Sequence, residues 1–195
     1  MMPSSPHLLR QRGTTLVEVL VTVVVLAFGL LGIAAFQAKA QAGSLEAYQR
    51  AQAVVLLEDM QARMSGNPEQ IAAYVTESPL GTEDTPGDCS EAEAGSARDK
   101  CEWSTALLGA AELKGADGAR AGAMLGARGC ITEIQALSNT AGACRSGIYQ
   151  VTVAWQGLHA TRAPNHTCGE GAYGDDETLR RAIGMRVAVG VPTCQ

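Results

Sequence analysis

The stretch RQRGTTLVEVLVTVVVLAFGLLGIAAFQ, residues 10–37, decides the architecture of this chain. From residue 16 to residue 35 it holds 13 side chains of the Leu, Ile, Val or Phe type, which together contribute about −4 to −8 kcal/mol to membrane insertion. Glu18 opposes insertion by about 3 kcal/mol. Twenty residues form a helix of about 30 Å, the thickness of the hydrocarbon layer. Residues 16–35 are therefore predicted to span a membrane. The carboxylate of Glu18 makes the free energy of insertion less favourable but does not change its sign.

Basic residues lie on the N-terminal side of this span. Arg10 and Arg12 precede it, so the positive-inside rule places the N-terminus in the cytoplasm and everything after Lys39 on the outer side. Residues 1–13 are polar, contain two prolines and show no periodicity. We expect them to form a leader that is not part of the fold.

All six cysteines lie on the outer side of the predicted span: Cys89, Cys101, Cys130, Cys144, Cys168 and Cys194. An even number of cysteines outside the cytosol favours disulfides over free thiols. Fifteen connectivities are possible, and we favour sequential neighbours: Cys89–Cys101, Cys130–Cys144 and Cys168–Cys194. A closed loop of about 15 residues contributes roughly 3 kcal/mol of stability, which would benefit a glycine-rich domain with a thin core.

A long helix is predicted from Thr14 to the sequence GNP at residues 66–68, which should end it. Its first half is apolar on all sides. In its second half Ala53, Leu57, Met60 and Met64 follow 4-3-4 spacing and form one seam, which should lie on a folded domain. The predicted organisation is a leader at residues 1–13, a helix at 14–66 with the span at 16–35, and a globular domain at 67–195.

Alternating apolar residues predict strands in the C-terminal part. The surest strand is IYQVTVAWQG, residues 148–157, followed by RAIGMRVAVGV at 181–191 and the weaker RGCITEI at 128–134. Residues 77–126 are rich in Gly, Ala, Asp and Glu and are expected to form loops, with one short helix around residues 103–113. Strands that follow one long helix indicate an α+β domain with an antiparallel sheet. Trp103 and Trp155 are expected to pack in its core or against its sheet.

The sequence offers little for catalysis or metal binding. It contains no G-x-S-x-G, no H-E-x-x-H and no phosphate-binding glycine loop, so we expect no catalytic residues, no cofactor and no enzyme activity. His166 and Cys168 could bind a metal, but no C-x-x-C pair exists and the only other histidine after the leader is His159. Without the leader, 13 basic and 20 acidic side chains remain, a net charge of −7, which argues against nucleic acid as a partner.

The stretch RGTTLVEVLVTVVVLAFGLLG resembles the N-terminal signature of type IV prepilins and related pseudopilins. The resemblance implies that a prepilin peptidase cuts between Gly13 and Thr14, that Thr14 becomes the methylated N-terminus, and that Glu18 is the fifth residue of the mature chain. In that family the glutamate of an incoming subunit meets the terminal amine of a neighbour in the filament. Thr14 departs from the Phe or Met that is common at the new terminus.

Elementary chemistry supports this interpretation. A cut after Gly13 leaves the apolar helix on the mature protein and creates an α-amino group that is largely cationic at neutral pH. That amine and Glu18 would lie four residues apart on one helix face, where pairing lowers the cost of each charge in lipid. A simpler alternative is a helix capping box, in which Thr15 and Glu18 fit the pattern S/T-x-x-E. The two interpretations are compatible in a free subunit.

A second resemblance is to the PilV-type minor pilins. It is carried by Tyr149, Val151, Val153 and Trp155, which match Y-x-V-x-V-x-W, and by the Arg180-Arg181 doublet before a final strand. The doublet could bind an anion, but we expect it to be a solvated start of that strand. A disulfide between Cys168 and Cys194 resembles the C-terminal loop that many pilins close in this way.

The resemblance implies a minor pilin that takes part in type IV pilus assembly or priming together with other major and minor pilins. The protein would wait in the bacterial inner membrane with a periplasmic C-terminal domain and then reach the cell surface. One alternative is a minor pseudopilin of a type II secretion system. Another is a soluble periplasmic binding domain, freed by cleavage after Ala40 in the signal-peptidase pattern Ala38-Lys39-Ala40.

Overall fold

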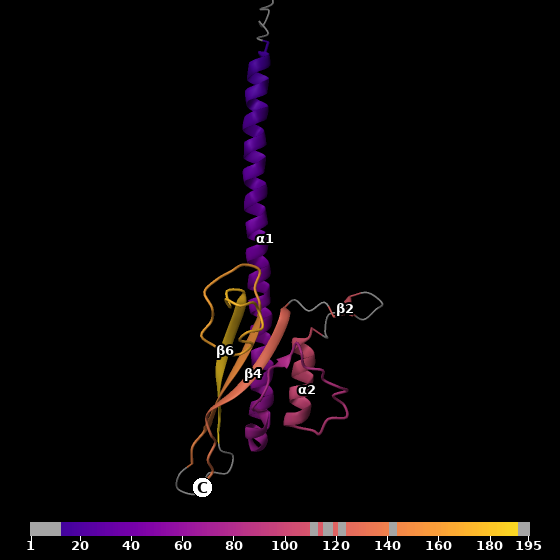
Figure 1. The fold of residues 1–195 in the computed structure, drawn as a ribbon, viewed down its shortest axis with the longest axis vertical. Helices are drawn as coiled ribbons and strands as arrows, with labels where there is room; N and C mark the ends of the chain where they lie inside the picture. Colours follow the sequence, from indigo (N-terminus) through magenta and orange to yellow (C-terminus); the bar gives the residue numbers. More distant parts are fainter. Residues whose placement is uncertain (1–12, 110–112, 115–118, 121–123, 141–143, 191–195) are drawn as a thin grey trace, which may run out of the picture. The chain divides into compact units, whose positions relative to one another are not determined.

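The computed structural model describes residues 13–109, 113–114, 119–120, 124–140 and 144–190 (Figure 1). In chain order its elements are α1 (Leu16–Gly66), η1 (Pro68–Tyr74), β1 (Leu80–Gly81), α2 (Ser96–Leu107), β2 (Leu113–Lys114), β3 (Ala119–Arg120), β4 (Leu125–Gln135), β5 (Gly147–Gln156) and β6 (Arg180–Val189). The chain divides into two compact units, Met1–Gly43 and Ser44–Gln195. The predicted α+β class is confirmed.

Helix α1 confirms the predicted helix, beginning two residues later than expected and ending at Gly66. After it, the amide of Asn67 donates to the carbonyl of Met64 at 3.3 Å, and Pro68 opens the short 3-10 helix η1. The predicted seam at Ala53, Leu57, Met60 and Met64 is buried. Gln49, four residues before Ala53, extends the buried seam by one turn.

Four strands form one antiparallel sheet in the order β1-β4-β5-β6. All three predicted strands are present, with β4 three residues longer at its start than the expected range. In the register, Tyr149 of β5 lies opposite Val187 of β6 and Glu133 of β4. β2 and β3 form a separate two-stranded pair within the region expected to be loops.

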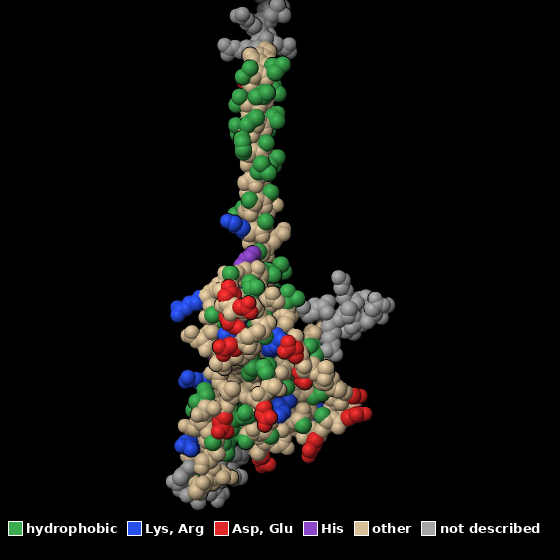
Figure 2. All heavy atoms as spheres, viewed as in Figure 1, with side chains coloured by type: hydrophobic (Ala, Val, Ile, Leu, Met, Phe, Trp, Pro, Cys, Tyr) green, Lys and Arg blue, Asp and Glu red, His purple; other side chains and the backbone are tan. Residues whose placement is uncertain are grey.

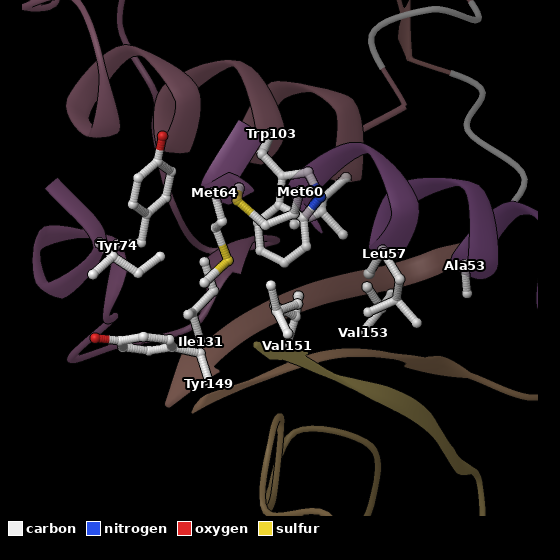
Figure 3. Close-up of a cluster of buried hydrophobic side chains, with 14 of the residues drawn as sticks. Ala53, Leu57, Met60, Met64, Tyr74, Trp103, Ile131, Tyr149, Val151 and Val153 are labelled. Atoms are coloured by element: carbon white, nitrogen blue, oxygen red, sulfur yellow. The ribbon is translucent and has the colours of Figure 1, made fainter. Parts of the chain in front are cut away.

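One face of the sheet carries the main core of the second unit. In Figure 3, Ile131, Val151 and Val153 lie between the sheet and the seam of α1. Trp103 of α2 is fully buried in this cluster, and its indole nitrogen donates to the Leu56 carbonyl of α1 at 2.9 Å. The bulky apolar side chains therefore join α1, α2 and the sheet into one unit.

The opposite face of β5 is buried as well, which its alternating sequence did not predict. Thr152 is 4% exposed and Ala154 is fully buried. Ala154 packs in a second cluster with Cys168 and Tyr173, both from the segment that joins β5 to β6. This segment covers the outer face at the centre of the sheet. Strand β5, whose alternating sequence predicts one buried face, is therefore buried on both faces.

The helix in the acidic region differs from its predicted place. It was expected around residues 103–113, whereas α2 spans Ser96–Leu107. Two features set its start. Gly95, just before the helix, has a φ of +99°, which favours glycine, and the amide of Ser96 donates a hydrogen bond to Oε1 of Gln70 at 2.9 Å. Since Gln70 belongs to η1, this boundary is not visible in the local pattern.

The disulfides correct part of the expected connectivity. Cys89–Cys101 is formed as expected, but Cys130 bonds to Cys168. The expected pairs Cys130–Cys144 and Cys168–Cys194 are therefore wrong. Cys144 is itself disulfide-bonded, and Cys194 lies outside the described residues. The physical reason is the fold of the β5–β6 segment, which brings Cys168 onto β4, although 38 positions separate the two cysteines in the sequence.

Candidate functional site

The start of α1 is capped by Thr15. Its side-chain Oγ1 accepts a hydrogen bond from the amide of Glu18 at 3.3 Å, and its carbonyl accepts from the amide of Val19 at 3.2 Å. Thr15 is therefore the N-cap and Glu18 the third helical residue. A carboxylate in the first turn interacts favourably with the positive end of the helix dipole. One of the two bonds of a capping box, from the Glu18 amide to the Thr15 hydroxyl, is thus present.

Gly13 and Thr14 precede this cap in a non-helical segment and are exposed. A Cβ built on Gly13 would have no heavy atom within 4 Å. The peptide bond between these two residues therefore lies in exposed, non-helical backbone, three residues before the first residue of the helix, Leu16. The structure places Gly13 and Thr14 immediately before the helix whose third residue is Glu18.

The first half of α1 has an exposed apolar surface. Between Leu16 and Phe36 its large apolar side chains are 44–82% exposed, and Figure 2 shows green side chains along this part of the helix. Thr22 donates its hydroxyl to the Val19 carbonyl at 2.8 Å, so this hydroxyl is bonded within the helix. Within the described residues, α1 alone is long and apolar enough to cross a membrane, with a mean hydropathy of 2.8 in its most apolar window.

The Arg180-Arg181 doublet is not solvated, which corrects the expectation from the sequence. Arg180 is 4% exposed; it pairs with Glu177 and donates to the carbonyls of His166 and Cys168. Arg181 pairs with Glu46 of α1 at 3.2 Å. Both guanidinium groups are therefore occupied in holding the β5–β6 segment and α1 to the sheet, rather than in binding an external anion.

Arg63 forms a further set of ion pairs within the protein, which the sequence did not predict. Its guanidinium lies within 2.6–3.1 Å of carboxylate oxygens from Asp59, Asp99 and Glu102. Burial works against the charged form, but the bonds to Glu102, Asp59 and Asp99 outweigh it and raise the pKa of Arg63 above its ordinary value. This charge network joins the end of α1 to α2.

The residues considered for metal binding, His166 and Cys168, both lie in the β5–β6 segment. Among the residues that the structure describes, no group of three or more His, Cys, Asp or Glu side chains could hold a metal ion. Cys168 is in a disulfide, which removes its thiolate as a ligand, and His166 meets Arg180 through its backbone carbonyl.

Comparison with protein families agrees with the geometry of the N-terminal segment. Residues 8–34 match the family model of the prokaryotic N-terminal methylation motif. No curated protein and no solved structure was found to match the chain. The match ends before the second compact unit, which begins at Ser44.

Together these observations support one class of protein. A methylation motif of the prepilin type, an N-capped helix of membrane-spanning length and an α+β unit stapled by disulfides support a type IV pilin-like protein. Such a motif implies processing by a prepilin peptidase and assembly with other pilins. It indicates a structural role rather than a catalytic one.

Proposed function

We propose that the protein is a minor pilin that takes part in the assembly or priming of a type IV pilus. The observation that carries the proposal is the N-terminal segment. There, an accessible Gly13–Thr14 bond, a capped helix with Glu18 as its third residue and an exposed apolar surface coincide with the methylation motif at residues 8–34. Before assembly, residues 16–35 would hold the protein in the inner membrane with the C-terminal unit in the periplasm.

The proposed chemistry begins with hydrolysis of the Gly13–Thr14 peptide bond by the prepilin peptidase. One water molecule is consumed, Gly13 keeps the new carboxylate and Thr14 gains an amine. The neutral form of that amine then displaces the demethylated product of a methyl donor and takes its methyl group. The methylated amine is cationic near neutral pH because the reference pKa of an α-amino group is about 8.

Glu18 would then set the position of the subunit in the filament. An apolar helix can slide along its neighbours at little cost, but an unpaired carboxylate in an apolar bundle is expensive. Pairing Glu18 with the terminal amine of a neighbour satisfies both charges at one stagger only. The carboxylate therefore determines the axial register, while the apolar surface provides most of the association energy.

The likeness to PilV-type minor pilins supports the minor-pilin role through residues that build the fold. Tyr149, Val151, Val153 and Trp155 are all buried on β5, and Arg180 and Arg181 are internal ties. A minor pseudopilin of a type II secretion system would use the same N-terminal segment and is the alternative within this class.

The soluble-domain alternative is disfavoured by one observation. Its cleavage site after Ala40 lies in the continuous helix α1, whereas proteases cut exposed, non-helical backbone most readily. The non-helical bond at Gly13–Thr14 fits that requirement better.

Intact mass and Edman degradation of the protein from its native membrane test the proposal. We expect a chain that begins at Thr14 and carries one added methyl group. A chain that begins at Gln41 would replace the proposal with a secreted domain. A chain that keeps residues 1–13 would remove the amine on which the proposal depends.

A further inference from the structure

A cleft of about 200 Å³ lies on the second unit, where three segments meet. Its walls are residues 76–79 between η1 and β1, two residues of β4, and residues 167–169 from the β5–β6 segment. The volume is below the roughly 300–1,000 Å³ of pockets for drug-sized ligands. The cleft therefore has room for a small molecule only.

The cleft is rich in hydroxyl groups. Thr76, Ser78, Thr132 and Thr167 all line it, and the last three of these residues are exposed. Each hydroxyl can donate one hydrogen bond and accept others, and each threonine adds a methyl group. Pro79 and the Cys130–Cys168 disulfide supply apolar surface between them.

The walls are held in place by bonds that do not involve a ligand. Thr76 exchanges hydrogen bonds with Ile131 of β4: its amide donates to the Ile131 carbonyl, and its Oγ1 accepts from the Ile131 amide, both at 3.0 Å. The disulfide joins β4 to the 167–169 wall, and Arg180 donates to the carbonyl of Cys168 at 3.2 Å. A preformed site loses little conformational entropy when a ligand binds.

The lining excludes other ligand classes. No Lys, Arg or His is among the residues that line the cleft, so a phosphate or carboxylate would find no opposite charge. Glu77 is its only carboxylate and both of its cysteines are oxidised, which leaves too few ligands for a metal ion. A purely apolar ligand would strip water from the three exposed hydroxyl groups, those of Ser78, Thr132 and Thr167, without replacing their hydrogen bonds.

We propose that this cleft binds a neutral polyhydroxyl ligand, with a single sugar ring as the unit that it recognises. Ring hydroxyls would bond to Ser78, Thr132 and Thr167, and the C–H face would lie on the disulfide and Pro79. This inference is independent of the proposed role in pilus assembly, because it uses only residues of the second unit.

Saturation-transfer NMR on the full-length protein, in a detergent without a sugar headgroup, tests the proposal. The probes are D-glucose, D-galactose, D-mannose and N-acetyl-D-glucosamine, with inorganic phosphate as the anionic control. We expect at least one sugar, and not phosphate, to receive saturation. Methyl glycosides of the same sugars mimic a residue within a glycan, so their relative affinity separates a glycan from a free sugar as the natural source.

Thr132→Val and Thr167→Val each remove one hydroxyl at nearly constant volume from an exposed position. Each is expected to raise the dissociation constant of the bound sugar about two- to tenfold, which is the effect of one lost hydrogen bond. Thr161→Val, the same change outside the cleft, serves as the matched control and should leave affinity unchanged. Absence of saturation transfer to all four sugars, preferential binding of phosphate, or equal affinity in all three variants would overturn the proposal.

Discussion

Glu18 is a single carboxylate in the first turn of α1, surrounded along the helix by exposed Leu and Val side chains. In the free subunit its place near the helix N-terminus is favourable because the first amides are partly positive. That interaction is worth a fraction of the roughly 3 kcal/mol by which an acidic residue opposes membrane insertion. The remainder is what pairing with a neighbour's terminal amine would recover in the proposed filament.

Replacement of Glu18 by Ala is therefore expected to leave membrane insertion and folding nearly unchanged, and to reduce the protein in sheared fibres at least tenfold. The comparison is made by immunoblot of the fibre and membrane fractions. Glu58→Ala is the matched control, since it makes the same change on an exposed face of the same helix but in the second unit. Normal amounts of the Glu18→Ala protein in fibres would show that the carboxylate does not set the register.

Gly129 of β4 is a residue at which no side chain fits. A Cβ there would lie 2.3 Å from ring atoms of Trp103, a rigid side chain that is fully buried in the core. Gly129→Ala should therefore destabilise the second unit by roughly 1–3 kcal/mol or more, lowering its melting temperature by roughly 2–4 °C per kcal/mol. Gly87→Ala has no heavy atom within 4 Å of the new Cβ and is the control for thermal unfolding. Equal melting temperatures for the two variants would contradict this packing.

At the scale of elements, the junction of α1, η1 and α2 is held by one polar cluster. A carboxylate oxygen of Asp99 in α2 lies 3.1 Å from the Arg63 guanidinium of α1. The same carboxylate accepts a hydrogen bond from the phenol hydroxyl of Tyr74, at the end of η1. Asn67 donates to both Tyr74 and Asp99, at 3.0 and 3.1 Å. Because Tyr74 is fully buried, its hydroxyl depends on these partners.

This cluster predicts a dependence of stability on alkaline pH. Burial, reinforced by the hydrogen bond to Asp99, raises the pKa of Tyr74 above its ordinary value near 10. Above pH 10 the unfolded chain loses this proton while the folded protein keeps it, so the free energy of unfolding falls as pH rises and is unaffected below that pH.

Tyr74→Phe should remove this part of the alkaline slope and cost roughly 1–3 kcal/mol at neutral pH through the lost hydroxyl bonds. Urea unfolding of both proteins at several pH values between 7 and 11 measures the two effects. An alkaline slope in Tyr74→Phe as steep as in the original protein would assign it to other tyrosines, since burial also raises the pKa values of Tyr149 and Tyr173.

For the whole molecule, the disulfides decide how the C-terminal part is held together. Cys89–Cys101 staples the segment before α2 to that helix, whereas Cys130–Cys168 fastens the long β5–β6 segment to the outer face of the sheet. Arg180 and Tyr173 act at the same place: Arg180 donates to the carbonyl of Cys168, and Tyr173 donates to the Gly126 carbonyl at 2.6 Å. The second face of the sheet is thus closed by covalent and polar bonds around a small apolar cluster.

Peptide mapping under non-reducing conditions is expected to recover Cys89–Cys101 and Cys130–Cys168, and to find Cys144 disulfide-bonded and not reduced. Recovery of a Cys130–Cys144 peptide would contradict the fold of the β5–β6 segment. In the chain-entropy account, loops of 38 and 12 positions are worth about 4 and 3 kcal/mol. Replacing the Cys130–Cys168 pair by serines should therefore destabilise the protein about 1 kcal/mol more than replacing Cys89–Cys101, measured by urea unfolding.

The sequence by itself determined the features that depend on neighbours along the chain. The apolar run at residues 16–35, the 4-3-4 seam at Ala53 to Met64, and the alternation in β5 each predict an element from its local period. The long helix, the three predicted strands and the α+β class are present as predicted. The capped start at Thr15 also follows from a pattern four residues long.

Only the tertiary structure decided what residues distant in sequence do together. The partner of Cys130, the burial of Arg180, the start of α2 beside Gln70 and the closed outer face at Ala154 all depend on where one segment folds against another. Periodicity shows which side of an element is apolar, but it does not show what covers the other side. That is decided by packing, because the free energy of burial belongs to the contact and not to either segment alone.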